Sequence, residues 1–337
     1  MKVGVVGFGY WGPHLVRNFK SLSEIDDVVV CDQSEDRVQA AIDLYPSIST
    51  FSDFSEMLGT GKLDVVAIAT PSNTHYELVK QALRTGLHVL VEKPITTNSE
   101  EAAELDEIAR ENGLVLMVDH TFLYSDSVTF MKNAIDDGRI GRVRSIDSVR
   151  VNLGIFQPDV SVAWDLAIHD LAIICHLLGE VPNKVSGTGS THTSSKHPST
   201  SYITLFFASG AVSHIHVSWT SPLKVRRIMV EGETGSFVFD DTLPDEKVKI
   251  YDAQVDSNSS EDGTSLLLNY RLGDVTSPRL PGKETLRTEL SQFIGSIQNK
   301  TAPLSSSASA VPLIRVLEAI DISISRHGAS VDVKQFV

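Results

Sequence analysis

Cysteine is scarce in this chain of 337 residues, which contains only Cys31 and Cys175. Both lie in apolar runs, where a thiol behaves as a small buried hydrophobic group. This usage argues against a disulfide framework and against a cysteine-based zinc motif, and we predict no metal site. Strand-like residues begin at Lys2, which leaves no room for a signal peptide, so we expect a reducing, cytoplasmic location.

Positive charge and long apolar runs are also lacking. The chain has 29 Lys and Arg against 43 Asp and Glu, a net charge of −14. Binding to nucleic acid or to an anionic membrane needs clustered basic residues, so we expect neither partner. No apolar stretch approaches the ~18 residues that span a bilayer. Hydrophobic residues, at 42% of the chain, suffice for a large core and favour two domains.

Residues 1–120 alternate short Val- and Ile-rich runs with amphipathic stretches. Continuous apolar strands that alternate with helices predict a parallel sheet covered on both faces, as in a doubly wound Rossmann α/β domain. The predicted strands lie at 2–6, 27–31, 64–69, 88–91 and 114–118, and the predicted helices near 13–21, 35–44, 74–85 and 99–112.

Residues 121–337 have a different pattern, which predicts an α+β domain with a large, mostly antiparallel open sheet. In 211–219 the alternation places Ile215 and Val217 on one face and His214 and His216 on the other. We expect a long loop over 253–283, with one strand at 266–270. Helices are predicted near 125–137, 284–298 and 308–327, and strands at 143–153, 183–190, 200–208, 211–219, 225–231 and 236–240.

A glycine motif connects the first predicted strand to the first predicted helix. In the run Gly7-Phe8-Gly9-Tyr10-Trp11-Gly12, the first glycine permits a tight turn and the second lets a pyrophosphate approach the backbone. Asp32 follows about 20 positions after the motif and ends the second strand. This context predicts a dinucleotide site, with a plain glycine-rich turn as the alternative.

Asp32 favours NAD over NADP. Its carboxylate would accept hydrogen bonds from ribose hydroxyls and repel a 2′-phosphate. Arg37 is close enough in sequence to weaken that repulsion, so NADP stays an alternative cofactor. Asp32 could instead only cap the next turn.

Further polar residues follow the other predicted strands, at the sheet edge where ligands bind in doubly wound folds. Each of three residues also has an alternative role. Thr74 could only cap a helix, Lys93 could be an ordinary surface lysine, and His120 could make a hydrogen bond at the domain junction. The predicted cofactor contacts at this edge are Thr70, Pro71, Asn73, His75, Glu92, Lys93 and His120.

Three residues could carry proton transfer. Lys93 can hydrogen-bond a substrate hydroxyl. Asp165 and His169 have i, i+4 spacing, which places them on one face of a helix. Histidine titrates near neutrality, so we predict His169 as general acid–base, with Asp165 orienting it or contacting sugar hydroxyls. A surface ion pair or a core histidine is the alternative.

These residues resemble the glucose–fructose oxidoreductase / inositol dehydrogenase family, often written Gfo/Idh/MocA. The resemblance covers nearly the whole chain and rests on the glycine motif, on Ala69-Thr70-Pro71 with Asn73 and His75, on Ala82 to Pro94, and on Asp165 with His169. It implies an NAD-binding Rossmann domain and a catalytic group of Lys93, Asp165 and His169. It also implies a C-terminal domain whose open sheet forms a homodimer or homotetramer.

Within the family, residues 164–170 and 218–224 resemble sugar-nucleotide oxidoreductases, including UDP-N-acetylglucosamine 3-dehydrogenases. We therefore expect hydride transfer between NAD and C3 of a nucleotide sugar. An inositol or free-sugar dehydrogenase is the alternative, although inositol dehydrogenases usually carry paired glycines where this chain has Val162-Ala163-Trp164. A non-catalytic NAD-bound sensor is a third alternative, which the presence of Lys93, Asp165 and His169 disfavours.

Overall fold

The computed structural model describes residues 1–157, 159–192, 196–256 and 269–333. The chain forms two compact units. The first comprises Met1–Ser125 and Lys283–Glu318, and the second Asp126–Gly282 and Ala319–Val337. Residues 283–318, which the sequence assigned to the second domain, thus belong to the first unit. The reason is that helix α8 (Thr285–Asn299) packs beside α1 (Gly12–Lys20) and buries its apolar face there.

The first unit is built on a parallel sheet of six strands in the order β3-β2-β1-β4-β5-β6. The order reverses between β1 and β4, which is the place where a doubly wound sheet binds a dinucleotide. Nearly every strand residue is buried, which confirms the predicted sheet with both faces covered. The strands are β1 (Lys2–Val6), β2 (Asp27–Cys31), β3 (Ser49–Phe51), β4 (Val65–Ile68), β5 (His88–Glu92) and β6 (Leu116–Asp119).

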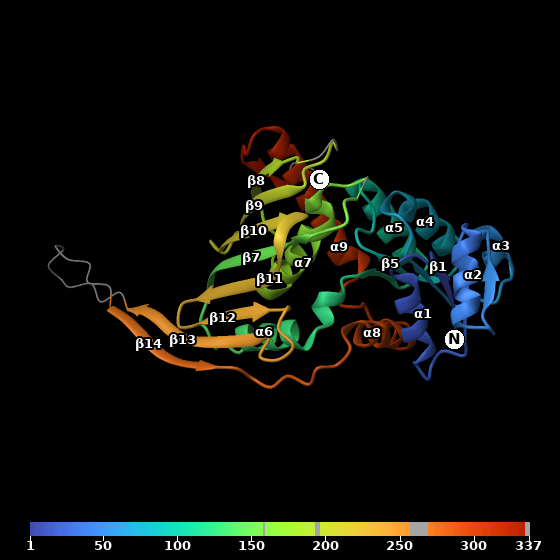
Figure 1. Cartoon of the computed structure of the whole chain (residues 1–337), viewed down its shortest axis with the longest axis horizontal. Helices are drawn as coiled ribbons and strands as arrows, with labels where there is room; N and C mark the ends of the chain where they lie inside the picture. The colour runs from blue at the N-terminus through green and yellow to red at the C-terminus, as the bar shows by residue number, and fades with distance from the viewer. Residues whose placement is uncertain (158, 193–195, 257–268, 334–337) are drawn as a thin grey trace. The chain divides into compact units, whose positions relative to one another are not determined.

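The helices of this unit connect successive parallel strands, and α4 and α5 lie side by side (Figure 1). Local chemistry sets their ends: the Asn98 side chain accepts hydrogen bonds from the first backbone N–H groups of α5. Besides α1, the helices in the first part of the chain are α2 (Glu35–Leu44), α3 (Phe54–Gly59), η1 (Ser72–Thr74), α4 (His75–Arg84), α5 (Ser99–Glu111) and η2 (Thr121–Tyr124). Helix α8 and helix α9 (Ser307–Ser325) come later in the chain, and α9 belongs to the first unit only as far as Glu318.

The second unit contains a sheet of nine strands in the order β14-β13-β12-β11-β7-β10-β9-β8-β15. Among the described strands of this sheet, only β10 and β7 pair in parallel, so the predicted, mostly antiparallel sheet is confirmed. Helices α6 (Asp126–Asp136) and α7 (Ile168–Leu178) pack against each other, and α7 packs on β7. The strands are β7 (Val143–Leu153), β8 (Lys184–Ser190), β9 (Thr200–Phe206), β10 (Val212–Ser218), β11 (Thr220–Gly232), β12 (Ser236–Asp240), β13 (Val248–Asp256), β14 (Asn269–Thr276) and β15 (Val331–Asp332).

The two faces of β10 differ as predicted. Ile215 and Val217 are fully buried, whereas His214 and His216 lie on the other face with Tyr202 of β9. The Tyr202 ring stacks on His216 at a centroid distance of 4.4 Å. This face therefore carries polar and aromatic groups, not apolar core.

The predicted long loop over 253–283 was wrong in part, because β13 and β14 pair as an antiparallel hairpin. Its Ser-, Asp- and Gly-rich sequence has little hydrophobic alternation, and the strands are held by backbone pairing that periodicity does not reveal. The strand predicted at 266–270 falls mostly outside the described residues. In the part of the chain that is described, no helix combines the length and apolarity needed to cross a membrane.

Candidate active site

The glycine motif has the geometry that a dinucleotide pyrophosphate requires. Gly7 has φ of +92°, and a Cβ there would lie 2.5 Å from the Ala69 carbonyl oxygen. A Cβ on Gly12 would lie 2.2 Å from the Gly7 carbonyl oxygen. A Cβ on Gly9, in contrast, would meet nothing closer than the Arg37 guanidinium at 3.8 Å, so the backbone surface there is open. The residues therefore fit NAD: two glycines serve packing and one leaves room for phosphate.

The aromatic residues of the motif have different surroundings. Phe8 is buried, and its backbone N–H donates to Asp32 Oδ2 at 2.7 Å. Tyr10 is 82% exposed and stacks on Trp11. No side chain makes a capping hydrogen bond at the N-terminus of α1, which begins at Gly12. The backbone N–H groups at this end are therefore available to the phosphates of the cofactor.

Asp32 sits at the end of β2, only 7% exposed. Oδ1 accepts a hydrogen bond from the Ser34 N–H at 2.9 Å, so the turn-capping alternative is part of its role. Arg37 Nη1 lies 3.6 Å from Oδ2. This ion pair places a cation beside the carboxylate that would contact the ribose, so the site carries both determinants that discriminate NAD from NADP.

The segments that follow β4 and β5 are joined by His75. Its ring is 1% exposed, with Nδ1 2.8 Å from the Pro94 carbonyl oxygen and Nε2 2.9 Å from the Thr70 carbonyl oxygen. Thr74 occupies the N-cap position of α4 but makes no capping hydrogen bond, and its hydroxyl lies 2.7 Å from that of Thr70. His75 thus positions the predicted cofactor-contacting residues around it, and its own contact with the cofactor stays a prediction.

Pro71 and Asn73 are exposed at this edge, and the Lys93–Pro94 peptide bond is cis. His120 follows β6 and is 3% exposed, and burial lowers its pKa to about 4. Its side chain is therefore a neutral imidazole at physiological pH. All predicted cofactor contacts belong to the first unit.

Asp165 and His169 belong to the second unit, on a helix that begins irregularly. Residues Ala163–Ala167 form a π-helical turn, η3, and regular α-helix starts only at Ile168. The backbone from Asp165 to His169 is therefore partly π-helical and not α-helical throughout, and the joint role of the two residues stays a prediction. Single π-turns of this kind occur frequently at functional sites.

Trp219, between β10 and β11, holds Asp165. Its indole Nε1 donates to Asp165 Oδ2 at 3.0 Å, and the residue is 2% exposed. In the sequence, Trp219 lies on the apolar face of a predicted strand and within residues 218–224, which resemble sugar-nucleotide oxidoreductases. Its one sequence signal was that a tryptophan on an apolar face carries an N–H that needs an acceptor.

Lys93 lies in the first unit and the Asp165–His169 pair in the second, so their joint action stays a prediction. In the first unit, Lys93 lies at the edge of the dinucleotide-binding sheet. In the second unit, the Asp165 carboxylate lies one helical turn before His169, whose Nδ1 is buried.

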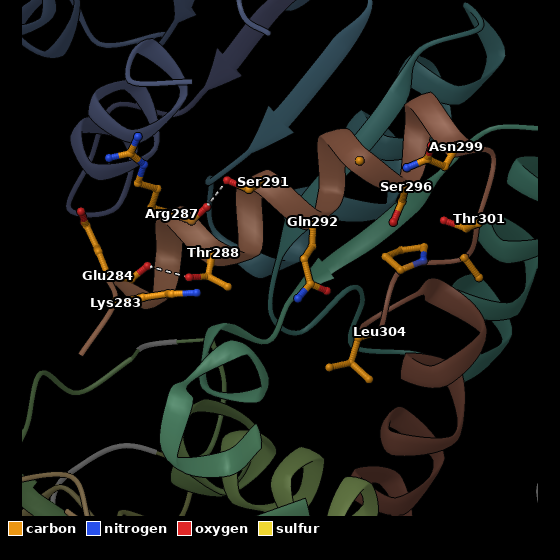
Figure 2. A pocket seen from close by; sticks show the side chains of 13 residues that line it. Lys283, Glu284, Arg287, Thr288, Ser291, Gln292, Ser296, Asn299, Thr301 and Leu304 are labelled. Atoms are coloured by element: carbon orange, nitrogen blue, oxygen red, sulfur yellow. Dashed lines mark hydrogen bonds between the residues drawn. The ribbon is translucent and has the colours of Figure 1, made fainter. Parts of the chain in front are cut away.

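A groove of about 870 Å³ runs along α8 and the segment after it (Figure 2). None of the predicted catalytic or cofactor-binding residues lines it, so we do not assign it to the reaction. Its lining is polar, with Lys283 and Arg287 at one end and Asn299 and Thr301 at the other.

Neither metal nor thiol chemistry is indicated. Among the described residues no group of three or more His, Cys, Asp or Glu side chains could hold a metal ion. Burial raises the pKa of both Cys31 and Cys175 to about 12, so neither thiol is a nucleophile near neutral pH.

Comparison with known proteins matches both parts of the chain to one family. The model of the GFO/IDH/MocA oxidoreductase family, with an NAD-binding Rossmann fold, matches residues 1–120. The model of the GFO/IDH/MocA C-terminal domain matches residues 128–238.

Two curated relatives have known activities. The UDP-N-acetylglucosamine 3-dehydrogenase of Acidithiobacillus ferrooxidans is 28% identical over 239 residues, which cover 68% of this chain and 71% of that protein. The myo-inositol 2-dehydrogenase of Thermotoga maritima is 26% identical over 270 residues, 77% of this chain and 80% of that protein. A levoglucosan dehydrogenase solved with NADH has the same fold, with a TM-score of 0.83, 18% identity and 99% of each chain covered.

Proposed function

This chain belongs to the GFO/IDH/MocA family of NAD-dependent oxidoreductases, and we propose that it transfers a hydride between the nicotinamide and C3 of a nucleotide sugar such as UDP-N-acetylglucosamine. The observation that carries the proton-transfer part is the Asp165 carboxylate held by Trp219 one turn before His169. The substrate is supported by the similarity to UDP-N-acetylglucosamine 3-dehydrogenase over 68% of the chain.

In the proposed oxidation the C3 hydroxyl loses a proton from oxygen and a hydride from carbon. NAD⁺, when bound, accepts the hydride. His169 takes the hydroxyl proton, and Asp165 orients the imidazole and stabilises its positive charge. Lys93 donates a hydrogen bond to the oxygen on which negative charge develops. Reduction of the 3-keto sugar uses the same groups in reverse.

The test is NADH formation with NAD⁺ against UDP-, GDP- and dTDP-sugars, free hexoses and inositols. Lys93→Met should abolish turnover and leave NAD binding largely intact. The matched control is Lys62→Met, at an exposed lysine of the first unit. Activity with one nucleotide sugar, absent only in Lys93→Met, supports the proposal, and undiminished turnover of Lys93→Met refutes the role of the lysine.

The second candidate is an inositol or free-sugar dehydrogenase, supported by the similarity to myo-inositol 2-dehydrogenase over 77% of the chain. A ligand that binds the native state raises its melting temperature. UDP should therefore stabilise the protein against heating if the substrate is a nucleotide sugar, and should have no effect if it is a free polyol.

The exposed face of the large sheet supports a homodimer or homotetramer. The proposed location of the enzyme is the cytoplasm. Its strands carry partly exposed large side chains, among them Tyr202 (47%), Val212 (41%) and Met229 (37%). Two copies that meet through this face would cover them in a symmetric contact. Light scattering of the native protein and of Tyr202→Glu should show a multimer that the charge dissociates, and a monomeric native protein would refute this arrangement.

A further inference from the structure

Three carboxyl groups of the first unit meet at the carboxyl ends of β5 and β6. Glu92 ends β5 and Asp119 ends β6, and the two are register partners in the parallel ladder. Partners in adjacent parallel strands lie side by side and point to the same face. Glu289 reaches Asp119 from α8, and its side chain is completely buried.

Asp119 is the member of this cluster whose carboxyl oxygens accept hydrogen bonds. Its Oδ2 accepts a hydrogen bond from Trp11 Nε1 at 3.0 Å. Its Oδ1 accepts from the Thr121 N–H at 3.2 Å and from the Thr121 hydroxyl. Donors directed at a carboxylate favour its charged form.

The surroundings of Glu289 favour its protonated form. Among the described residues no donor bonds either of its carboxyl oxygens. Burial, and then the adjacent Asp119, raise its pKa well above the ordinary value. A buried carboxyl without donors beside a second carboxyl group keeps its proton.

Glu92 has a related environment. Its Oε1 is buried with no partner in the described part of the chain, and burial followed by Asp119 raises its pKa well above the ordinary value. The other titratable groups around the cluster are Lys93, His120 and Tyr124. Lys93 lowers the pKa of Glu92, whereas burial raises the pKa of Tyr124. The cluster thus combines one carboxylate with protonated carboxyls and little positive charge.

The position of the cluster connects it to the pyrophosphate and nicotinamide parts of the cofactor. Trp11, which donates to Asp119, is part of the glycine motif that faces the pyrophosphate. Strands β4, β5 and β6 form the half of the doubly wound sheet that takes the second mononucleotide, which in NAD is the nicotinamide half.

We propose that the Glu289–Asp119 pair, with Glu92 beside it, releases a proton when the oxidised, cationic nicotinamide binds and retains that proton when the reduced, uncharged form binds. A cation close to a protonated carboxyl favours its ionisation, and removal of the cation reverses the effect. The proton passes from the Glu289 carboxyl to solvent on binding of NAD⁺ and returns when the ring is reduced. This inference depends on NAD binding by the first unit and not on which sugar is the substrate.

The consequence is a difference in how the two cofactor forms respond to pH. Release of one proton on binding makes the dissociation constant of NAD⁺ fall by up to about tenfold for each unit of rising pH. Binding of NADH should change little over the same range.

Isothermal titration calorimetry of the substrate-free protein tests this. The heat of binding NAD⁺ or NADH is measured in two buffers of different ionisation enthalpy, which reports the protons released. Glu289→Gln keeps the size of the side chain and supplies an amide N–H to Asp119. Glu111→Gln, at an exposed glutamate at the end of α5, is the matched control.

The native protein and Glu111→Gln should release a proton with NAD⁺ and none with NADH, and Glu289→Gln should release less than half as much with NAD⁺. Equal proton release for NAD⁺ and NADH in the native protein would overturn the proposal, and this comparison needs no variant to fold. Undiminished release from Glu289→Gln would overturn it as well. Turnover is not needed for this measurement, so a failure of the proposed substrate would appear only in the activity assay.

Discussion

The indole of Trp219 donates its N–H to the carboxylate of Asp165, at 3.0 Å, across the junction between a β-strand and a π-helical turn. The two residues are 54 positions apart in the chain. A buried tryptophan of the large sheet thereby restricts one predicted catalytic carboxylate to a single orientation.

Trp219→Phe should lower kcat by about 10- to 100-fold, which is the usual effect of losing a residue that orients a functional group through a hydrogen bond. The ring remains but the donor is lost, so Asp165 no longer holds one geometry. NAD affinity should not change. The pH dependence of kcat, measured with the active substrate, should also shift, because in the proposed reaction Asp165 orients His169, which takes the proton.

Trp164→Phe is the matched control for this variant. Trp164 Nε1 donates to Asp321 Oδ2 at 2.6 Å, so the control removes a comparable hydrogen bond from a comparably buried indole of the same unit. Both variants should lose stability, by ~1–3 kcal/mol. If both lost activity equally, Trp219 would have only a structural role.

Asp32 and Arg37 should determine the cofactor preference with opposite signs. Asp32→Asn removes the charge that repels a 2′-phosphate and should raise the ratio of kcat/KM for NADP⁺ to that for NAD⁺ by about tenfold, equivalent to ~1.4 kcal/mol. Adding Arg37→Ala should lower that ratio again, because the cation beside the phosphate position is lost. An unchanged ratio in both variants would contradict the assignment of this pair to the ribose site.

Buried His120 should make the protein less stable in acid. Its folded-state pKa is lowered from 6.5 to about 4 by burial, so the unfolded chain binds the extra proton first. Stability is therefore complete above pH 6.5 and falls as the pH decreases toward 4, by up to about 3 kcal/mol. Urea unfolding of His120→Gln should show a shallower loss over this window, and an equal slope in both proteins would exclude His120 as the cause.

The ion pair between Arg150 and Asp170 should be necessary for folding but replaceable as a pair. The guanidinium contacts both carboxyl oxygens, at 2.9 and 3.0 Å, and the two residues are 5% and 1% exposed. Asp170→Asn should cost about 3–5 kcal/mol, because it leaves a buried positive charge.

The double variant Arg150→Met/Asp170→Leu should recover most of that loss, since apolar side chains of similar size avoid the desolvation penalty. Denaturant unfolding of the three proteins measures the differences. A double variant as unstable as Asp170→Asn would show that the pair contributes more than charge compensation.

The dinucleotide site of the first unit could be predicted because it is formed by residues that lie close together in the sequence. The turn at Gly7, the open backbone at Gly9 and the acidic end of β2 all follow from residues within about one βαβ unit, so the dinucleotide site could be assigned from the sequence. The large sheet was also predicted in outline, because one-sided burial leaves an alternating pattern in each strand.

The pairing of β13 with β14 was missed because residues 253–283 are rich in Ser, Asp and Gly and were interpreted as a loop, and because the sequence of a strand does not reveal its partner. The π-turn before His169 was missed for a related reason: helical periodicity predicts a helix but not which kind of turn begins it.

The sequence by itself determined which groups are available: a dinucleotide loop, a lysine at the sheet edge, and a carboxylate and histidine a few residues apart. Only the tertiary structure decided which groups meet. It brought α8 into the first unit so that Glu289 faces Asp119, and it brought Trp219 to Asp165. Contacts between residues far apart in the chain depend on how whole elements pack, and packing leaves no fixed spacing in the sequence.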